Sequence, residues 1–244
     1  MDQELLKMLK YLKLSGLISQ LDRFIEKAKT SDISHLRWLK SIIEEEYRLK
    51  QENARKRRLC RAKIPEMWLF ETFPFTRQPN LDRKKVSHLY DDFDYMTQAR
   101  NILFFGPTGV GKTGLATAFL AQAIDRGYNG RFILFPELVE LLYKSIADHS
   151  EEKLINKFAA WDCLLIDELG YVELEPVQVG LFFTLMQKRH KKKATLITSN
   201  LGFDQWASFL KNDHLTAALI DRLTEVSHIV NMKNCVSLRP RLTS

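Results

Sequence analysis

The sequence predicts an α/β fold, in which a parallel sheet of five strands lies between helices and follows a small all-helical module. Short apolar runs alternate with helix-like stretches in the larger, C-terminal part of the chain, as is typical of parallel sheets covered on both faces. A G-x-x-x-x-G-K-T motif, Gly106–Thr113, follows the first of these runs. Pro65, Pro74 and Pro79 fall close together before it and mark a boundary, because proline interrupts helices.

The first 63 residues predict a helical module. Apolar residues recur at three- or four-residue spacing in three segments, which is the spacing of one helix face. Ser31 and Asp32 offer an N-cap before the third segment. We therefore expect a helical DNA- or partner-binding module over residues 1–63, a linker over 64–80 and an ATPase domain over 81–244. The apolar positions are Leu5, Leu6, Leu9 and Leu12, then Leu17, Leu21, Phe24, Ile25 and Ala28, and then Leu36, Leu39, Ile43 and Tyr47.

Five apolar runs predict the strands of the second domain, and the stretches between them predict its helices. The runs cover residues 101–105, 131–135, 163–166, 195–198 and 228–230, and the helical stretches cover 113–126, 138–147 and 177–190.

Composition narrows the class of protein. Lys and Arg number 37 against 30 Asp and Glu, and the net charge of +7 favours a polyanionic partner. No uncharged run exceeds the twelve residues of Thr113–Ile124, whereas a membrane helix needs about 18, so we expect no membrane span. The start of the chain lacks the pattern of a secretory signal. The chain has three cysteines, Cys60, Cys163 and Cys235, which are far apart in the sequence. An odd number at such spacing argues against a set of disulfides, so we expect the protein to be located in the reducing cytoplasm.

The glycine-rich motif predicts a phosphate-binding loop for ATP and Mg²⁺. Glycines let backbone N–H groups approach the phosphates, and the helix that follows points its positive end at them. Lys112 is expected to reach the β and γ phosphates, and the Thr113 hydroxyl to bind magnesium. The residues expected to bind nucleotide are Gly106, Pro107, Thr108, Gly109, Val110, Gly111, Lys112, Thr113 and Gly114.

Polar residues end two later strands of the predicted sheet. Asp167 and Glu168 follow the third apolar run, and Asn200 follows the fourth. Ligands bind at the carboxyl ends of parallel strands. We expect Asp167 to hold magnesium, Glu168 to polarise the attacking water as general base, and Asn200 to sense the γ-phosphate or to orient water.

Basic residues are concentrated between Arg48 and Lys63. This segment holds eight basic residues and one acidic residue, Glu52, so its charge equals that of the whole chain. We expect it to bind DNA phosphates, although a solvated helix face is the alternative. A second cluster, Lys188–Lys193, is a weaker candidate. The residues expected to contact DNA are Arg48, Arg55, Lys56, Arg57, Arg58, Arg61 and Lys63, with Lys50 in the same segment.

Several of these stretches resemble the IstB/DnaC family of AAA+ ATPases. The resemblance lies in the phosphate loop and in Leu164–Tyr171, Thr198–Asn200 and Ala218–Leu223, together with the N-terminal Ser34–Trp38 and Arg57–Pro65. It covers nearly the whole chain and is closer to IstB, a transposition helper, than to DnaC, a helicase loader. It implies a P-loop AAA+ domain, hydrolysis of ATP, and assembly into an oligomer on duplex DNA that helps a cognate transposase engage its target.

The resemblance also assigns residues. Lys112, Thr113, Asp167, Glu168 and Asn200 match the nucleotide motifs of the family. Arg222 matches the arginine that reaches the nucleotide of a neighbouring subunit, although an internal pair with Asp221 or Glu225 is an alternative for it.

The chain also departs from the family pattern. It has Phe73-Pro74-Phe75 where Phe-Asp-Phe is common, Glu225 where a histidine is common, and Val236-Ser237-Leu238 where Ser-Tyr-Arg is common. A second nucleotide-sensing arginine is therefore left open, with Arg239 one residue out of register. The stretch after Arg222 is too short for the separate helical lid of many AAA+ proteins.

Two functions fit this sequence. One is an ATP-hydrolysing switch that assembles on DNA and recruits a transposase. The other is a DnaC-like helicase loader, whose main act is to bind another ATPase. A DNA-binding scaffold with an inactive nucleotide site is a third option, but the intact Lys112, Asp167 and Glu168 argue against it.

Overall fold

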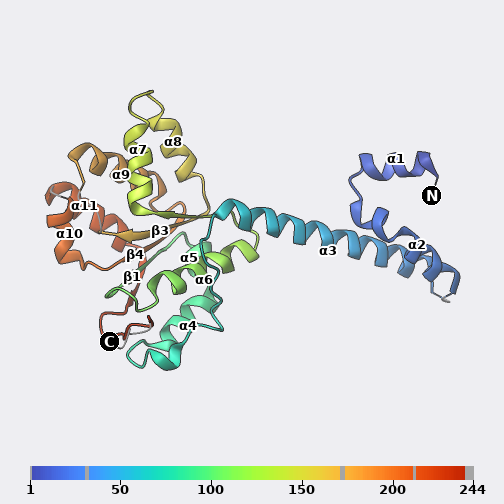
Figure 1. Ribbon diagram of the computed structural model, residues 1–244, viewed down its shortest axis with the longest axis horizontal. Coiled ribbons are helices and arrows are strands. Elements are labelled where there is room, and N and C mark those ends of the chain that lie inside the picture. Colours follow the sequence, from blue (N-terminus) through green and yellow to red (C-terminus); the bar gives the residue numbers. More distant parts are fainter. Residues whose placement is uncertain (1, 31–32, 171–173, 211–212, 240–244) are drawn as a thin grey trace, which may run out of the picture. The chain divides into compact units, whose positions relative to one another are not determined.

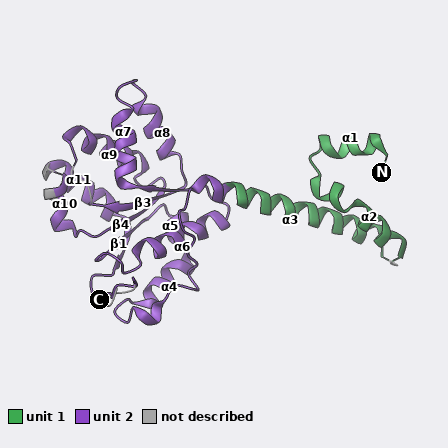
Figure 2. Cartoon of the chain, in the orientation of Figure 1, with its two compact units in different colours: residues 1–57 green, residues 58–244 purple. Residues whose placement is uncertain are grey.

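The computed structural model describes residues 2–30, 33–170, 174–210 and 213–239. The chain divides into two compact units, residues 1–57 and 58–244 (Figure 2). The Ser31–Asp32 cap expected from the sequence lies outside the described residues. None of the described helices is long and apolar enough to cross a membrane.

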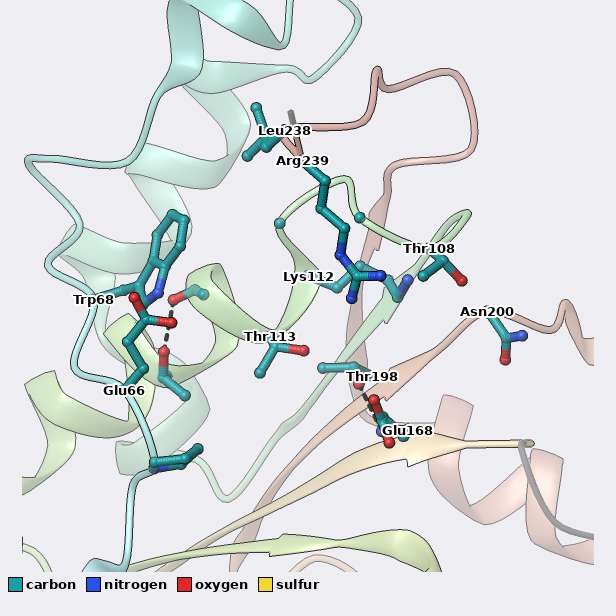
Figure 3. Close-up of a pocket in the computed structure, with 15 residues that line it drawn as sticks. Glu66, Trp68, Thr108, Lys112, Thr113, Glu168, Thr198, Asn200, Leu238 and Arg239 are labelled. Atoms are coloured by element: carbon teal, nitrogen blue, oxygen red, sulfur yellow. Dashed lines mark hydrogen bonds between the residues drawn. The ribbon is translucent and has the colours of Figure 1, made fainter. Parts of the chain in front are cut away.

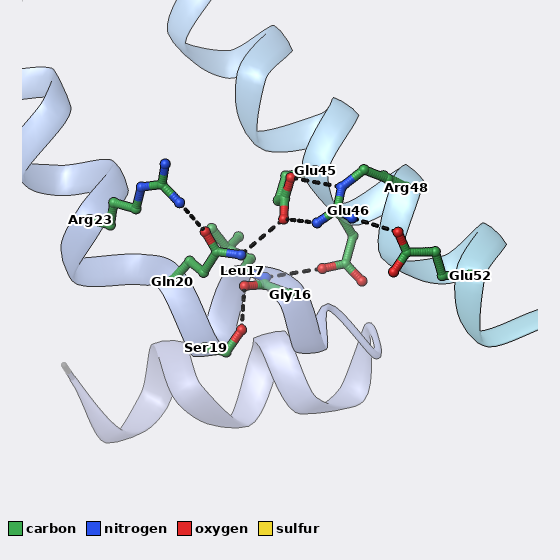
Figure 4. Close-up of polar contacts among 9 residues, drawn as sticks. All are labelled: Gly16, Leu17, Ser19, Gln20, Arg23, Glu45, Glu46, Arg48 and Glu52. Carbon is green, nitrogen blue, oxygen red and sulfur yellow. Dashed lines mark hydrogen bonds and ion pairs between the residues drawn. The ribbon is translucent and has the colours of Figure 1, made fainter. Parts of the chain in front are cut away.

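The first unit contains helices α1 (Gln3–Tyr11), α2 (Ser15–Thr30) and most of α3 (His35–Ala62), so the three expected helices are confirmed. The Glu46 carboxylate, on α3, accepts a hydrogen bond from the Leu17 N–H at 3.0 Å (Figure 4). This contact satisfies an amide in the first turn of α2 that has no partner within its own helix. Gly16 permits the close approach, because a Cβ there would lie 2.4 Å from Leu49.

The apolar stripe expected on α3 does not form the core of this unit. Leu36, Leu39, Ile43 and Tyr47 are between 49% and 76% exposed. A different face of α3 packs against α2, where the Trp38 indole N–H donates to the Phe24 carbonyl at 2.9 Å. The 3–4 spacing therefore identified the helix but not its buried side.

The second unit is built on a parallel sheet with the strand order β2-β3-β4-β1-β5. The five strands confirm the expected runs to within three residues at each end. They are β1 (Asn101–Phe105), β2 (Gly130–Leu134), β3 (Cys163–Leu169), β4 (Ala194–Ser199) and β5 (Ser227–Asn231).

Helices cover both faces of this sheet (Figure 1). Ile102 and Phe104 of β1 pack into one apolar cluster, while Leu103 and Phe105 pack into the other, as the two-residue period of a strand requires. The first cluster lies under α4 (Arg83–Asp92), α5 (Asp94–Thr97) and α6 (Lys112–Asp125). The second lies under α7 (Phe135–Lys144), α8 (Glu151–Ala159), α9 (Pro176–Arg189), α10 (Phe203–Leu210) and α11 (Asp213–Thr224).

Residues 64–80, which the prolines predict to be a linker, pack within the second unit. Phe73 is buried, and Gln78 is only 1% exposed. The Gln78 amide nitrogen donates to the carbonyls of Val110 and Val236 at 2.9 and 2.6 Å, and its oxygen accepts from the Val236 N–H at 2.9 Å. The segment is rich in aromatic side chains, and burying them against the sheet domain stabilises this arrangement over a free linker. It includes the short 3₁₀ helix η1 (Phe75–Arg77).

Candidate nucleotide-binding site

A cavity of about 510 Å³ lies at the carboxyl ends of β1, β3 and β4 (Figure 3). This is the size range of small-molecule sites in proteins. The phosphate loop, Glu168 and Asn200, which are far apart in the sequence, meet in it. Its lining is Pro65, Glu66, Trp68, Thr108, Gly109, Gly111, Lys112, Thr113, Gly114, Thr117, Glu168, Thr198, Asn200, Leu238 and Arg239.

The phosphate loop connects β1 to α6. Gly109 and Gly111 have φ values of +85° and +98°, a conformation that favours glycine. The loop thereby places the N-terminus of α6, with its unpaired N–H groups, at the cavity. The Lys112 ammonium donates to the carbonyls of Gly106 and Pro107 at 2.8 and 2.9 Å. Burial lowers the pKa of Lys112, an effect that Asp167 and Glu168 oppose.

A hydroxyl and a carboxylate meet where magnesium is expected. The Thr113 hydroxyl donates to Asp167 at 2.9 Å, and the Thr198 hydroxyl donates to the same carboxylate. Burial raises the pKa of Asp167, while these two hydrogen bonds lower it. Hard oxygen donors of this kind are what Mg²⁺ prefers, and a cation would favour the charged carboxylate that burial disfavours. The residues therefore fit the ion.

Glu168 occupies a strained position at the end of β3. Its φ is +64°, and the pairing of β3 with β4 shifts register between Ile166 and Leu169. Its N–H donates to the Thr198 hydroxyl at 3.0 Å, which fixes the backbone there. Left-handed backbone at a non-glycine residue is costly and concentrates at functional sites. This irregularity within β3 leaves the Glu168 carboxylate exposed at the cavity.

Asn200 lies across the cavity from Trp68, and the Arg239 side chain extends toward Lys112 (Figure 3). The Asn200 side-chain oxygen is buried and has no hydrogen-bond partner among the described residues. A buried acceptor without a hydrogen bond costs free energy, so this atom is suited to accept a hydrogen bond from a bound ligand or water. Arg239, whose role the sequence leaves open, lines the cavity, and its charge adds to the burial that lowers the pKa of Lys112.

Arg222 lies away from this cavity, near the end of the sheet where the strands begin. The carbonyl of its neighbour Leu223 accepts a hydrogen bond from the side chain of Asn101, which is the first residue of β1. The phosphate loop follows the last residue of β1, so the two lie at opposite ends of this strand. The Arg222 guanidinium donates to the Ala218 carbonyl at 3.2 Å and lies 4.8 Å from the centre of the Phe183 ring. Within the described part of the chain it forms no ion pair. Glu225, one of the partners considered, pairs instead with Lys191 and His190.

The basic residues of α3 differ in what they contact. Arg48 pairs with Glu45 and Glu52 at 2.6 and 2.5 Å (Figure 4). The Arg58 guanidinium is half-buried and donates to the Ile124 carbonyl at 3.2 Å. Arg48 and Arg58 are therefore engaged within the protein. Arg55 also has a partner but is exposed, as are the side chains of Lys56, Arg57, Arg61 and Lys63.

The second basic cluster is largely neutralised. Arg189 is 1% exposed and donates to several carbonyls, among them that of Trp161 at 2.7 Å. Lys191 pairs with Glu225 and Lys193 with Asp162. These contacts leave little free positive charge there, so the cluster is a poor candidate for DNA contact.

Sequence reasoning missed several residues of the cavity. Thr198 stands out in the sequence only as one residue of a motif, yet its hydroxyl joins Asp167 to the Glu168 backbone. Trp68 and Leu238 come from segments about 40 residues before and 130 residues after the phosphate loop, and nothing local predicts that they meet it. The dense aromatic composition of residues 68–75 was a usable signal, since a solvated linker rarely carries so many rings.

Known proteins share this sequence and fold. The model of the IstB-like ATP-binding protein family matches residues 7–244. The chain is 30% identical over 230 residues to the putative ATP-binding protein of insertion sequence IS21 from Pseudomonas aeruginosa, covering 94% of this chain and 86% of that protein. It is 33% identical over 208 residues to the putative ATP-binding protein of insertion sequence IS5376 from Geobacillus stearothermophilus, covering 85% and 82%.

Solved structures support the fold. DnaI matches with a TM-score of 0.59 at 22% identity, over 70% of this chain and 93% of that one. The DnaC helicase loader matches with a TM-score of 0.52 at 23% identity, over 62% and 87%. The fold is that of a P-loop AAA+ domain, as the motifs predict, although Tyr171 of one motif lies outside the described residues. The nucleotide motifs, the fold and the family match agree, and the chain belongs to the family of IstB-like ATP-binding proteins.

Proposed function

We propose that this protein is an ATPase that oligomerises on duplex DNA and helps a transposase select and engage its target. The observation that carries the proposal is the convergence of Lys112, Glu168 and Asn200 in one cavity, with Asp167 hydrogen-bonded to Thr113 of its lining. Membership in a family whose relatives are insertion-sequence proteins supports the transposition role. We place its action in the bacterial cytoplasm, on DNA.

The residues that converge at the phosphate loop have distinct tasks in this proposal. Lys112 and the amides of the phosphate loop bind the β and γ phosphates, while Thr113 and Asp167 hold Mg²⁺. When bound, Mg²⁺ supplies positive charge against the phosphates. Glu168 accepts a proton from the attacking water, and Asn200 orients that water or contacts the γ-phosphate. Thr198 keeps Asp167 and Glu168 in register through its hydroxyl.

Arg222 is proposed to act on the nucleotide of a neighbouring subunit. β1 is five residues long, so about 15 Å of strand separates the end of α11 from the loop of the same chain. An arginine that cannot reach its own phosphates can still meet those of a second copy, as arginine fingers do. Hydrolysis would then depend on self-association.

DNA binding is proposed for the exposed basic residues at the C-terminal end of α3 and for Lys63, which follows the helix. Arg55, Lys56, Arg57, Arg61 and Lys63 lie within nine residues of one another. Phosphate contacts of this kind give affinity without sequence preference. Arg48 and Arg58 are better explained as structural residues, because two carboxylates neutralise Arg48 and Arg58 is half-buried.

The test is a reconstituted strand-transfer reaction. The protein, ATP and target DNA are combined with a cognate transposase, and in parallel with the replicative helicase of the same cell. The proposal predicts DNA-stimulated ATP hydrolysis and a higher strand-transfer yield with the transposase. Stable binding and loading of the helicase, with no effect on strand transfer, would favour the helicase-loader alternative instead.

A further inference from the structure

The cavity has a second end, away from the reacting groups. There it is lined by Pro65, Glu66 and Trp68, all from the segment between α3 and α4 (Figure 3). None of these side chains has a role in the hydrolysis described above. Any role for them in ligand binding rests on the proposal that the cavity binds ATP.

The orientation of a bound nucleotide follows from the loop. Lys112 reaches toward the β and γ phosphates, and Glu168 and Asn200 stand at the γ end. The α phosphate then lies over the start of α6, and the nucleoside must leave past Gly114. The remaining lining in that direction is Pro65, Glu66, Trp68, Thr117 and Leu238, and Trp68 carries the one aromatic ring among them. A flat aromatic surface therefore stands where the nucleoside emerges.

Trp68 is held in place by its contacts. A Cβ built on Gly114 would lie 2.6, 2.7 and 3.0 Å from Cδ2, Cε3 and Cε2 of the indole. Two of these are the ring-fusion carbons, so the face of the ring, not its edge, covers Gly114. Phe73 is buried and supports the indole, with ring centroids 6.2 Å apart. The indole itself is half-buried and keeps part of its surface in the cavity.

We propose that Trp68 is the surface on which the purine base of the nucleotide packs. A purine is flat and apolar on its faces, and stacking on an aromatic side chain contributes substantially to its binding. Stacking does not depend on which base is present, because every base has a π-face. Gly114 is part of the same device, since any larger residue there would displace the ring.

The experiment compares two ligands that share phosphates but differ in the base. Binding of Mg²⁺–ATP and of Mg²⁺–tripolyphosphate is measured by calorimetry for wild type, Trp68→Ala and Trp68→Phe. We expect Trp68→Ala to weaken ATP binding by roughly 5- to 100-fold, the range for one stacked base. Tripolyphosphate binding should stay within about twofold, and Trp68→Phe should keep most of the ATP affinity, because a phenyl ring still stacks.

A matched control and a second readout guard against a general loss of structure. Trp161→Phe removes an indole from the same unit, outside the cavity, and should leave both affinities unchanged. ATP, but not tripolyphosphate, should alter the intrinsic tryptophan fluorescence of wild type and of Trp161→Phe, and should not alter that of Trp68→Phe.

Equal losses for ATP and tripolyphosphate in Trp68→Ala would overturn the base-packing role and leave Trp68 a support for the phosphate loop. Unchanged ATP affinity in that variant would overturn it too. If wild type bound neither ligand, the proposed ATPase function would fail first, and this inference with it.

Discussion

Glu168 is the side chain whose chemistry can be isolated most cleanly. Its backbone is fixed by the Thr198 hydroxyl, so Glu168→Gln should keep the local geometry. The amide cannot take a proton from water, and losing a general base costs roughly 10² to 10⁴ in rate. We expect ATP to bind with near-normal affinity and complexes with DNA to persist. Single-turnover hydrolysis of labelled ATP measures this, and a wild-type rate in the variant would remove Glu168 as the base.

The charge of Asp167 is expected to destabilise the folded protein when ATP and Mg²⁺ are not bound. Burial raises its pKa, so the fold favours the protonated carboxyl and the charge present at neutral pH is destabilising. Asp167→Asn keeps a similar shape without the charge. The ligand-free variant should therefore have a higher Tm than wild type at pH 7.5, and should lose Mg²⁺-dependent ATP binding.

The difference in Tm between Asp167→Asn and wild type should depend on pH. As the pH falls through the raised pKa, wild-type Asp167 becomes protonated and its cost disappears, so the difference in Tm should shrink. Scanning calorimetry from pH 7.5 to 4 measures it. Asp91→Asn, at an exposed position on α4, should change the Tm little. A variant that is less stable than wild type by the same amount at every pH would contradict a destabilising charge at Asp167.

At the scale of the helix, we expect the basic end of α3 to contribute to DNA binding and the paired cluster at residues 188–193 not to do so. Replacing Lys56, Arg57 and Arg61 with Gln removes three exposed charges. If all three contact phosphates, the slope of log affinity against log salt should flatten by up to about 2.7, at about 0.9 per contact. Fluorescence anisotropy with duplex DNA at several salt concentrations measures the slope.

The matched control removes the same charge elsewhere. Lys188, Lys191 and Lys193 already contact Asn156, Glu225 and Asp162, so their replacement with Gln should change the salt slope little. Equal changes of slope in the two triple variants would mean that α3 has no special part in DNA binding.

The elements that the sequence predicted well are those with local signals. The run at residues 101–105 is β1 itself, and the phosphate loop and Asp167 lie where their motifs place them. Strand order was not predictable, because it depends on contacts between distant segments. The same limit hid Trp68, which packs against Gly114, and Gln78, which hydrogen-bonds to Val110 and Val236, because these contacts join segments far apart in the sequence.

Sequence periodicity also proved ambiguous in one place. In α3, the residues at 3–4 spacing are exposed, and Glu46 is buried instead because it caps α2. A pattern of apolar residues predicts an amphipathic helix, but which face is buried depends on the element that packs against the helix. Charge patterns were ambiguous in the same way, since Arg48, Arg58 and Arg189 proved to have partners within the protein.

At the scale of the whole molecule, the position of Arg222 predicts an active site shared between two copies. Arg222→Ala alone and Lys112→Ala alone should each be inactive, because each lacks one half of the site. A mixture should regain some hydrolysis where an intact loop meets an intact Arg222, since such fingers contribute about 10³ to 10⁵ in rate. Steady-state phosphate release measures this. A mixture that stayed inactive, although mixed oligomers had formed, would show that Arg222 does not act in trans.

The central claim is that ATP in this cavity drives assembly on DNA, and sedimentation velocity tests it most directly. The protein is centrifuged with duplex DNA and a non-hydrolysable ATP analogue, with ADP, or without nucleotide, beside the Lys112→Ala variant. Lys112 is 8% exposed and lies in the loop, so its loss should leave the phosphate charge uncompensated. We predict large complexes on DNA only for wild type with the ATP analogue. Complexes of the same size without nucleotide, or with Lys112→Ala, would contradict the claim.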